Sequence, residues 1–230
     1  MTRERITIGN GDHEKISKTD VETSVLRSPK AYLVLKRALD ILISFAGIIV
    51  LAPAFLVISI AVMVGDGKGK PFFVETRVGK NGLPFSMYKF RTMYPGAENE
   101  HDLLVSVKPE KDIASKIRND PRVTKVGRWL RRTGLDELPQ LLNVLKGEMS
   151  LVGPRPPLPA EVEMYDDYQK LRLLVKPGLT CLWQITPKRN DIPFDEWIQL
   201  DLGYICKRNL LLDLEIIVRT FGVVFPGEGI

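Results

Sequence analysis

Residues 41–64 read ILISFAGIIVLAPAFLVISIAVMV and contain no charged side chain. As a helix this stretch would be about 36 Å long at roughly 1.5 Å per residue, enough to cross a hydrocarbon core of about 30 Å. It is not typical of a cleaved signal peptide, because a long polar segment precedes it and the DGKGK that follows is no small-residue cleavage site. We therefore predict a membrane segment that stays in the mature protein.

Two features of this segment argue against a simple span. Pro53 lies near its middle, lacks an amide hydrogen and crowds the carbonyl four residues before it, so a kink or a break is expected there. Both flanks are basic, so the positive-inside rule assigns no orientation and each end has a cytoplasmic character. We predict a re-entrant helix-break-helix over residues 31–66, with a proline-kinked spanning helix as the open alternative. The flanking cations are Arg27, Lys30, Lys36 and Arg37 before it and Lys68, Lys70, Arg77 and Lys80 after it.

The composition describes a folded protein with an anionic partner. With 44% hydrophobic residues, a chain of 230 residues can bury a core. The net charge of +5 favours an anion, which could be a nucleic acid, a lipid headgroup or a phosphorylated substrate. Nucleic acid fits poorly, because the basic residues alternate with acids and no RNA or DNA motif is present. The two cysteines, Cys181 and Cys206, form no CxxC pattern and predict neither a disulfide framework nor a zinc site.

On either side of the membrane segment the sequence changes character. Residues 1–30 are polar with little periodicity, which predicts a mobile tail, and residues 67–230 predict a cytosolic domain. In that domain two aromatic and β-branched runs flank residues 79–82, GKNG, whose Asn-Gly pair favours a β-hairpin. Over residues 209–225 the apolar positions exceed one buried face, which indicates a helix on the membrane surface. The predicted fold class is α+β, mostly helical, with a re-entrant membrane helix hairpin, a small β-hairpin and interfacial amphipathic helices.

Residues 133–144 read TGLDELPQLLNV and predict the first turns of an apolar helix. Gly134 suits the end of the helix before it. Thr133 followed by Asp136 resembles a capping box, and Pro139 suits a first turn, where its missing amide hydrogen has no partner to lose. The residues before this stretch place three cations on one helical face, at i, i+3 and i+4. These cations are Arg128, Arg131 and Arg132.

The acidic pair Asp136 and Glu137 lies in that first turn. The positive end of the helix dipole and the nearby guanidinium groups favour an ionised carboxylate. Asp136 is therefore predicted to be a persistently charged nucleophile or metal ligand, not an acid with a raised pKa. Glu137 would oppose this unless a divalent cation or the arginines offset its charge. Helix capping with a surface ion pair is the open alternative.

Two other basic positions are fixed by the local sequence. Lys89 and Arg91 alternate with aromatic residues, so they share one face of the second strand, as either a solvated face or a phosphate site. Prolines at positions 154, 156, 157 and 159 force a rigid extended path that holds Arg155. A rigidly held arginine suits bidentate binding of phosphate, with a structural linker as the alternative.

Several motifs in order carry a resemblance. They are KRALDI, RVGKNGLPFSMYKFRTM, DPRVTKVGRWLRRTGLDELPQLLNVLKGEMSLVGPRP, VKPGLTCLWQ and LDLGY. Over about residues 32–225 the chain resembles the bacterial sugar transferase family, the monotopic polyprenyl-phosphate glycosylphosphotransferases or phosphoglycosyl transferases. The resemblance implies transfer of sugar 1-phosphate from a UDP-sugar to undecaprenyl phosphate, with UMP released. It places the protein at the cytoplasmic face of the bacterial inner membrane, in contact with membrane lipid, in the first membrane step of exopolysaccharide, O-antigen or glycoprotein glycan assembly.

The resemblance also implies roles for residues. Asp136 would attack the β-phosphate to form a covalent phosphosugar enzyme, and Glu137 would help to hold Mg²⁺. A set of basic positions would bind phosphate, while two later acids match family positions without a role that can be derived. The basic positions are Lys89, Arg131, Arg155 and Arg189, and the later acids are Asp201 and Asp213.

This sequence departs from the family pattern in two places. It has GLTCLWQ for GLTGLWQ and ITPKRN for a Ser-Gly-Arg turn, which weakens the assignment of Arg189. Larger members carry a four-helix membrane domain before this module, so the polar tail predicts the minimal form. Two rival functions stay open, a membrane-anchored non-catalytic scaffold for glycan assembly and a metal-dependent phosphodiesterase acting on nucleotide sugars. The sequence leaves open the sugar and the oligomeric state.

Overall fold

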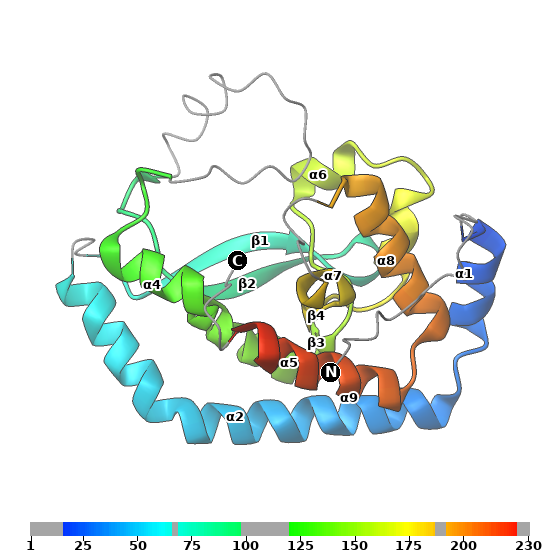
Figure 1. The fold of residues 1–230 in the computed structure, drawn as a ribbon, viewed down its shortest axis with the longest axis horizontal. Coiled ribbons are helices and arrows are strands. Elements are labelled where there is room, and N and C mark those ends of the chain that lie inside the picture. Colours follow the sequence, from blue (N-terminus) through cyan, green and yellow to red (C-terminus); the bar gives the residue numbers. More distant parts are fainter. Residues whose placement is uncertain (1–15, 66–68, 98–119, 187–191, 225–230) are drawn as a thin grey trace, which may run out of the picture.

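The computed structural model describes residues 16–65, 69–97, 120–186 and 192–224. The fold is α+β and mostly helical, with two small two-stranded sheets (Figure 1). The helices are α1 (Lys18–Leu26), α2 (Lys30–Val64), α4 (Lys125–Thr133), α5 (Leu141–Lys146), α6 (Pro159–Glu163), α7 (Leu182–Ile185), α8 (Phe194–Lys207) and α9 (Leu210–Val224), with 3-10 turns η1 (Lys80–Gly82), η3 (Leu135–Gln140) and η4 (Gln169–Leu174). The strands are β1 (Phe72–Val78), β2 (Pro84–Phe90), β3 (Ser150–Val152) and β4 (Gly178–Thr180).

Helix α2 contains the predicted membrane segment. Its most apolar window has a mean hydropathy of 2.8, and 11% of that window is buried, so the helix is long and apolar enough to cross a membrane and is not a core helix. It continues through Pro53 and changes direction in its second half (Figure 1). The predicted break, and with it the helix hairpin, is therefore wrong, whereas the predicted kink agrees with the bend. A proline removes one backbone hydrogen bond, and a helix held on both sides of it absorbs that loss by bending.

The first half of α2 is tied to the rest of the chain by charged side chains. The Arg37 guanidinium donates to the carbonyl oxygens of Val144 and Leu145 at 2.6 and 2.7 Å, where α5 ends. A cation there also complements the negative end of the α5 dipole. The Asp40 carboxylate accepts from the Leu151 amide at 2.9 Å and from the Ser150 hydroxyl at 3.1 Å. These bonds fix α2 to α5 and β3.

The second half of α2 is tied by apolar packing. Ile58 and Val62 are buried against Phe90 of the hairpin and Leu130 of α4. Both halves of the helix thus contact the same domain, and the side of α2 that faces away from it is apolar. Its most exposed apolar side chains include Leu42, Phe45, Ile49, Val50, Leu56, Val57 and Val64.

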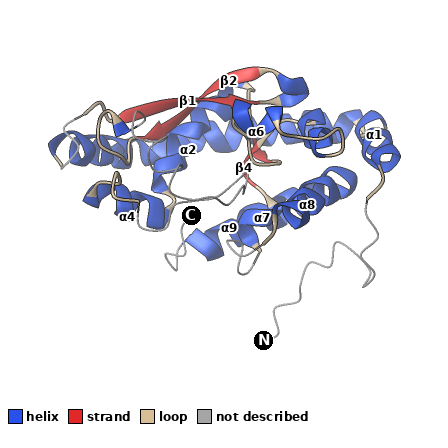
Figure 2. Cartoon of the chain, turned by 90° about the horizontal axis from the view of Figure 1, so that it is seen from above, coloured by secondary structure: helices blue, strands red, loops and turns tan. Residues whose placement is uncertain are grey.

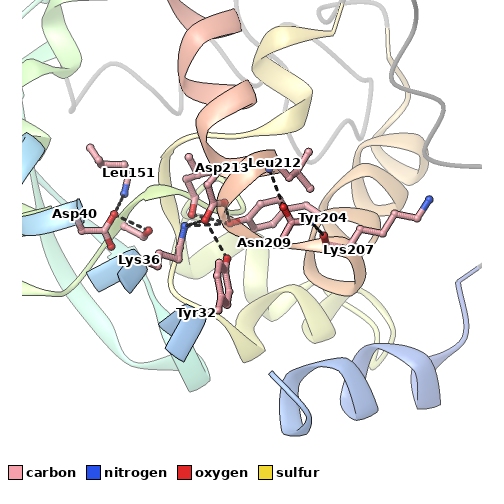
Figure 3. A network of polar contacts seen from close by, with 11 residues as sticks. Tyr32, Lys36, Asp40, Leu151, Tyr204, Lys207, Asn209, Leu212 and Asp213 are labelled. Atoms are coloured by element: carbon pink, nitrogen blue, oxygen red, sulfur yellow. Dashed lines mark hydrogen bonds and ion pairs between the residues drawn. The ribbon is translucent and has the colours of Figure 1, made fainter. Parts of the chain in front are cut away.

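A buried network around Asp213 joins α2 to α8 and α9 (Figure 3). The Asp213 carboxylate accepts hydrogen bonds from Lys36 at 2.9 Å, Tyr32 at 3.0 Å and Tyr204 at 2.7 Å. Lys36 also donates to the Tyr204 hydroxyl at 3.2 Å. This arrangement gives Asp213 the structural role that the sequence did not supply.

The predicted β-hairpin is confirmed. β1 and β2 pair antiparallel, and the turn between them contains Asn81 with φ 58° and Gly82 with φ 78°, values that Asn and Gly tolerate best. Phe73 lies opposite Lys89, and the Arg91 guanidinium lies 5.7 Å from the Phe73 ring. Lys89 and Arg91 therefore lie on the same face of the hairpin as Phe73, as their alternation predicted.

The core lies between the hairpin and the C-terminal helices. In Figure 2 the hairpin and the α8–α9 pair lie on opposite sides of the molecule, with β4 between them. β3 pairs with β4 in parallel. The buried core around these strands includes residues of β3, α8 and α9. Its fully buried members include Val144, Met149, Val152, Leu202, Ile205 and Ile216.

Both ends of the described chain are helical. Ser17 caps α1 by accepting from the Asp20 amide, and Val21 is fully buried in the core beside α8. The prediction of a mobile tail is thus wrong for residues 18–26, because Val21 and Val25 pack into the core and the Tyr168 hydroxyl donates to the Ile16 carbonyl just before the helix. The predicted C-terminal helix is observed as α9, whose exposed apolar side chains recur along one face. They are Leu211, Leu214, Val218 and Phe221.

Candidate active site

The acidic pair follows a sharp helix end. Gly134 ends α4 with φ 67°, as predicted, and its amide donates to the Arg131 carbonyl at 3.3 Å. The chain then enters η3, which contains Asp136 and Glu137 and leads directly into α5. Thr133 belongs to α4 and donates back to the Trp129 and Leu130 carbonyls, so the predicted capping box is wrong. The pair lies in a 3-10 turn before the α-helix.

Asn143 ties the segment of the acidic pair to the hairpin. It is fully buried in α5, its amide donates to the Ser86 carbonyl at 2.7 Å, and its oxygen accepts from the Tyr88 amide at 3.1 Å. These bonds fix η3 and α5 against the edge of β2, next to Lys89. Sequence reasoning missed this residue, although an asparagine inside the apolar run LLNVL is an available signal.

Lys89 and Arg131 lie on two sides of the acidic pair. The Lys89 ammonium is 3.7 Å from a Glu137 carboxylate oxygen, and burial lowers the pKa of Lys89 while Glu137 partly restores it. Arg131 donates through Nε to the Thr92 hydroxyl at 3.0 Å. Burial lowers the pKa of Arg131 and the nearby Asp136 carboxylate opposes that effect.

Asp136 is not the persistently charged acid that the helix dipole predicted. Burial, and then the like charge of Glu137, raise its pKa to about 6, against the opposing effects of Lys89 and Arg131. The prediction failed because a single 3-10 turn offers little dipole and the folded chain withdraws the carboxylate from water. At neutral pH the group is still mainly ionised, so it retains a nucleophilic oxygen.

Arg155 reaches the same site from the proline-rich segment. Its guanidinium lies 5.8 Å from the rings of both Trp183 and Trp197, which stack on each other at 4.4 Å. Burial lowers the pKa of Arg155, and the Glu137 carboxylate partly offsets this effect, so the two charges lie within electrostatic range. The structure therefore gathers Lys89, Arg131 and Arg155 around the acidic pair, whereas Arg189 lies outside the described residues.

A second arginine supports this region from β1. Arg77 is buried, pairs with Glu75 at 2.6 Å and donates to the Pro156 carbonyl at 3.0 Å. The sequence had offered Arg77 only as a membrane-flanking cation. Its actual partners lie in the hairpin and in the proline-rich segment, which it joins.

The donor set at the site can be tested against Mg²⁺. Among the described residues no group of three or more His, Cys, Asp or Glu side chains lies close enough to hold a metal ion alone. Mg²⁺ typically binds one or two carboxylates and completes its shell with phosphate and water oxygens. Asp136 and Glu137 are such a pair, and their mutual repulsion is what a divalent cation would relieve. The residues present thus fit Mg²⁺ bound together with a phosphorylated substrate.

Comparisons with known proteins agree with this site. A family model for bacterial sugar transferases matches residues 31–227. The chain is 41% identical over 233 residues to the galactosyl transferase CpsE of Streptococcus agalactiae serotype III, covering 98% of this chain and 51% of that protein. It is 41% identical over 198 residues to the exopolysaccharide production protein ExoY of Sinorhizobium fredii, covering 84% and 87%. It is 41% identical over 201 residues to the undecaprenyl-phosphate galactose phosphotransferase of Salmonella typhimurium, covering 85% and 41%.

The matched region includes every element that builds the site. The chain spans about half the length of the streptococcal relative and less than half of the Salmonella relative. It spans most of ExoY. The residues matched by the family model run from the start of α2 past the end of α9. The chain therefore belongs to the bacterial sugar transferase family.

Proposed function

We propose that this chain transfers a sugar 1-phosphate from a UDP-sugar to undecaprenyl phosphate, giving undecaprenyl diphosphate sugar and UMP. The observation that carries the proposal is the half-buried Asp136–Glu137 pair set among Lys89, Arg131 and Arg155. The relatives' names support the same class of reaction, since one is an undecaprenyl-phosphate galactose phosphotransferase and another a galactosyl transferase. In a bacterium this would be the first membrane step of polysaccharide or glycan assembly.

The reaction divides into two displacements at one phosphorus atom. In the first, an oxygen of the ionised Asp136 bonds to the β-phosphorus of the UDP-sugar. The bond to the bridging oxygen breaks, UMP leaves with that electron pair, and an aspartyl phosphosugar remains. In the second, a phosphate oxygen of undecaprenyl phosphate bonds to the same phosphorus and the Asp136 carboxylate leaves.

The surrounding cations suit this chemistry. Phosphoryl transfer spreads negative charge over the equatorial oxygens, and fixed positive charges in a site withdrawn from water stabilise that charge without reorganising. Arg131 and Arg155 can each present two N–H groups to a phosphate, and Lys89 offers a point charge. Arg189 is proposed as a further phosphate contact from the family pattern.

Glu137 would hold Mg²⁺ through its carboxylate. When bound, Mg²⁺ would supply charge that neutralises the diphosphate and the leaving UMP. Independently of the metal, Lys89 pairs with Glu137 at 3.7 Å and partly offsets the rise that burial causes in the pKa of Asp136, which favours the ionised nucleophile.

The structure supports a position of the protein on one side of the membrane. Tyr32 and Lys36 near the start of α2 contact Asp213, and Ile58 and Val62 near its end contact the hairpin. A helix that crossed the bilayer could not keep both ends on one soluble domain. We therefore propose that α2 lies bent in one leaflet, at the cytoplasmic face of the inner membrane, with the apolar face of α9 at the lipid surface.

The reaction is tested by UMP release from UDP-galactose, UDP-glucose and their N-acetylated counterparts. Each donor is given with and without undecaprenyl phosphate and with and without Mg²⁺. Sustained release that needs the acceptor supports the transferase, with a single turnover at most when the acceptor is omitted. A phosphodiesterase would release UMP continuously without acceptor, and a scaffold would release none.

The membrane arrangement has its own test. An Asn10→Cys variant with Cys206→Ser is labelled by an impermeant maleimide in intact spheroplasts and in inside-out vesicles. Labelling only in inside-out vesicles supports the one-sided arrangement. Labelling only in spheroplasts would require α2 to span.

A further inference from the structure

Residues 154–157, which present Arg155, are held in place through their backbone carbonyl groups. Three of these four residues are prolines, which have no amide hydrogen to donate, so only acceptors are available along most of the segment. All four successive carbonyl oxygens accept a hydrogen bond. The donors are the Gly178 amide to Pro154 (2.9 Å), Arg172 to Arg155 (3.0 Å), Arg77 to Pro156 (3.0 Å) and the Val78 amide to Pro157 (2.9 Å).

Among these donors Arg172 alone acts on Arg155 itself. Its side chain is 2% exposed, and its terminal nitrogens donate to the Arg155 carbonyl and to the Tyr165 hydroxyl at 2.8 Å. The same guanidinium forms an ion pair with the Asp201 carboxylate at 2.6 Å. It also lies 5.5 Å from the ring of Trp197, the same ring that the Arg155 guanidinium approaches. Arg172 therefore touches both the backbone of Arg155 and the aromatic surface on which the Arg155 side chain rests.

Asp201 balances the charge of this arrangement. Its side chain is 1% exposed, and the positive charges of Arg172 and Arg155 both act on it. Without this carboxylate, Arg172 would be an uncompensated buried cation next to the cationic Arg155. Stability does not account for such a pair, because replacing both members of a buried ion pair by apolar residues is often neutral or stabilising.

We propose that Arg172 and Asp201 are positioning residues for Arg155, fixing its backbone and the Trp197 surface so that its guanidinium faces the donor diphosphate. The pair does not touch the reacting atoms and acts through Arg155. The proposal rests on the proposed function for its effect on turnover, but its effect on the Arg155 segment is independent of that function.

A double-mutant cycle tests the coupling. The paired variant Arg172→Met/Asp201→Leu removes both buried charges together, which preserves folding better than either change alone. With UDP-galactose or whichever donor the wild type uses, Arg155→Ala is expected to lower kcat/KM for UMP release about 100-fold, as for loss of one charge-stabilising donor. In the paired background the same change should lower it no more than about threefold, because Arg155 is already displaced. Equal losses in the two backgrounds would overturn the proposal.

The matched control is Arg219→Met/Glu215→Leu, which removes an exposed ion pair of 2.6 Å in α9. In that background Arg155→Ala should retain its full effect. A reduced effect there would mean that loss of any ion pair masks Arg155, which contradicts a specific role for Arg172 and Asp201.

Hydrogen exchange gives a readout that needs no substrate. In the paired variant, the Gly178 and Val78 amides, which donate to the Pro154 and Pro157 carbonyls, should exchange about tenfold faster, while amides in the first half of α2 stay unchanged. Unchanged exchange of the Gly178 and Val78 amides would overturn the positioning role even if activity falls. If exchange is faster in the paired variant but the wild-type protein releases no UMP from any donor, the proposed function is refuted and the structural role remains.

Discussion

Asp136 and Asp213 are two carboxylates set among cations, and they differ in how the fold uses their oxygens. Asp213 is buried and accepts hydrogen bonds from Tyr32, Lys36 and Tyr204. Within the part of the chain that the structure describes, no side chain donates a hydrogen bond to Asp136, and its neighbour Glu137 carries the same charge. One carboxylate is saturated by the fold, and the other keeps its oxygens available.

The difference separates an anchor from a candidate nucleophile. Charge and nearby cations alone would have suggested either residue for catalysis. A carboxylate whose oxygens already accept strong bonds has little basicity left for attack, whereas burial and a like charge raise the energy of an ionised carboxylate that accepts no side-chain hydrogen bond. Removing each residue should therefore damage a different property of the protein.

The largest effect is expected on activity from Asp136→Asn. The amide cannot form the phosphosugar ester, so transfer should fall by at least about 1,000-fold, as for loss of a covalent nucleophile. The measurement is UMP release together with mass spectrometry of the protein incubated with donor alone. Stability should not fall, since a crowded negative charge is removed. If the variant folds and still transfers at the wild-type rate, Asp136 is not the nucleophile.

The matched change Asp213→Asn should act on stability instead. It leaves Lys36 without its counter-charge at the junction of α2, α8 and α9, which is expected to lower the free energy of unfolding by about 3 kcal/mol. Denaturant unfolding in detergent micelles measures this loss, and activity per folded molecule should fall far less than in Asp136→Asn. The paired change Lys36→Met/Asp213→Leu should recover part of the stability. If it does not, hydrogen bonds from the two tyrosines dominate the anchor.

The ionisation of Asp136 should make stability fall and the transfer rate rise as the pH increases. Its pKa is raised from 3.8 to about 6, so the folded state binds this proton more tightly than the unfolded state. Its ionisation therefore lowers stability above pH 6, and that penalty disappears as the pH falls towards 4. Denaturant unfolding at a series of pH values without Mg²⁺ measures this penalty, and Glu137→Gln should lower the pKa that it reports. An unchanged pKa would argue against repulsion within the pair. Transfer needs the ionised form, so the single-turnover rate with donor should rise with pH, and bound Mg²⁺ would lower its midpoint below that of the metal-free protein.

A smaller effect is expected from Asn143→Ala. The change leaves the Ser86 carbonyl and the Tyr88 amide without their partner beside Lys89, which should lower stability by about 2 kcal/mol. Misalignment of η3 against β2 should lower kcat about tenfold, with KM for the donor changed less. Steady-state kinetics and denaturant unfolding measure the two effects. A loss of stability without any loss of kcat would mean that Asn143, like Asp213, stabilises the fold without aligning the site.

Local patterns in the sequence predicted the local parts of this fold. The Asn-Gly turn of the hairpin, the left-handed Gly134 and the apolar helix α9 depend on neighbouring residues, and each was found. The gathering of Lys89, Arg131 and Arg155 at the acidic pair came from the family resemblance, because no spacing along the chain brings a strand, a helix and a proline-rich segment together.

The remaining features depend on contacts between distant residues. Asp213 lies 177 positions from Lys36, and Asp201 finds its partner Arg172 only when α8 packs on η4, so neither role can be read from nearby sequence. The raised pKa of Asp136 depends on burial that the helix pattern does not contain. Pro53 predicted a break because the local cost is visible in sequence, whereas the contacts that hold both halves of α2 are not.

The attachment of both ends of α2 to one domain bears on how the protein would respond to lipid length. A segment that crosses a bilayer is strained when the hydrocarbon is too thin or too thick. If α2 rests in one leaflet as proposed, it has no second surface to reach, so lengthening the acyl chains of a vesicle should neither tilt it nor shift the acidic pair relative to the phosphate layer. Transfer would then proceed equally well in thin and thick bilayers.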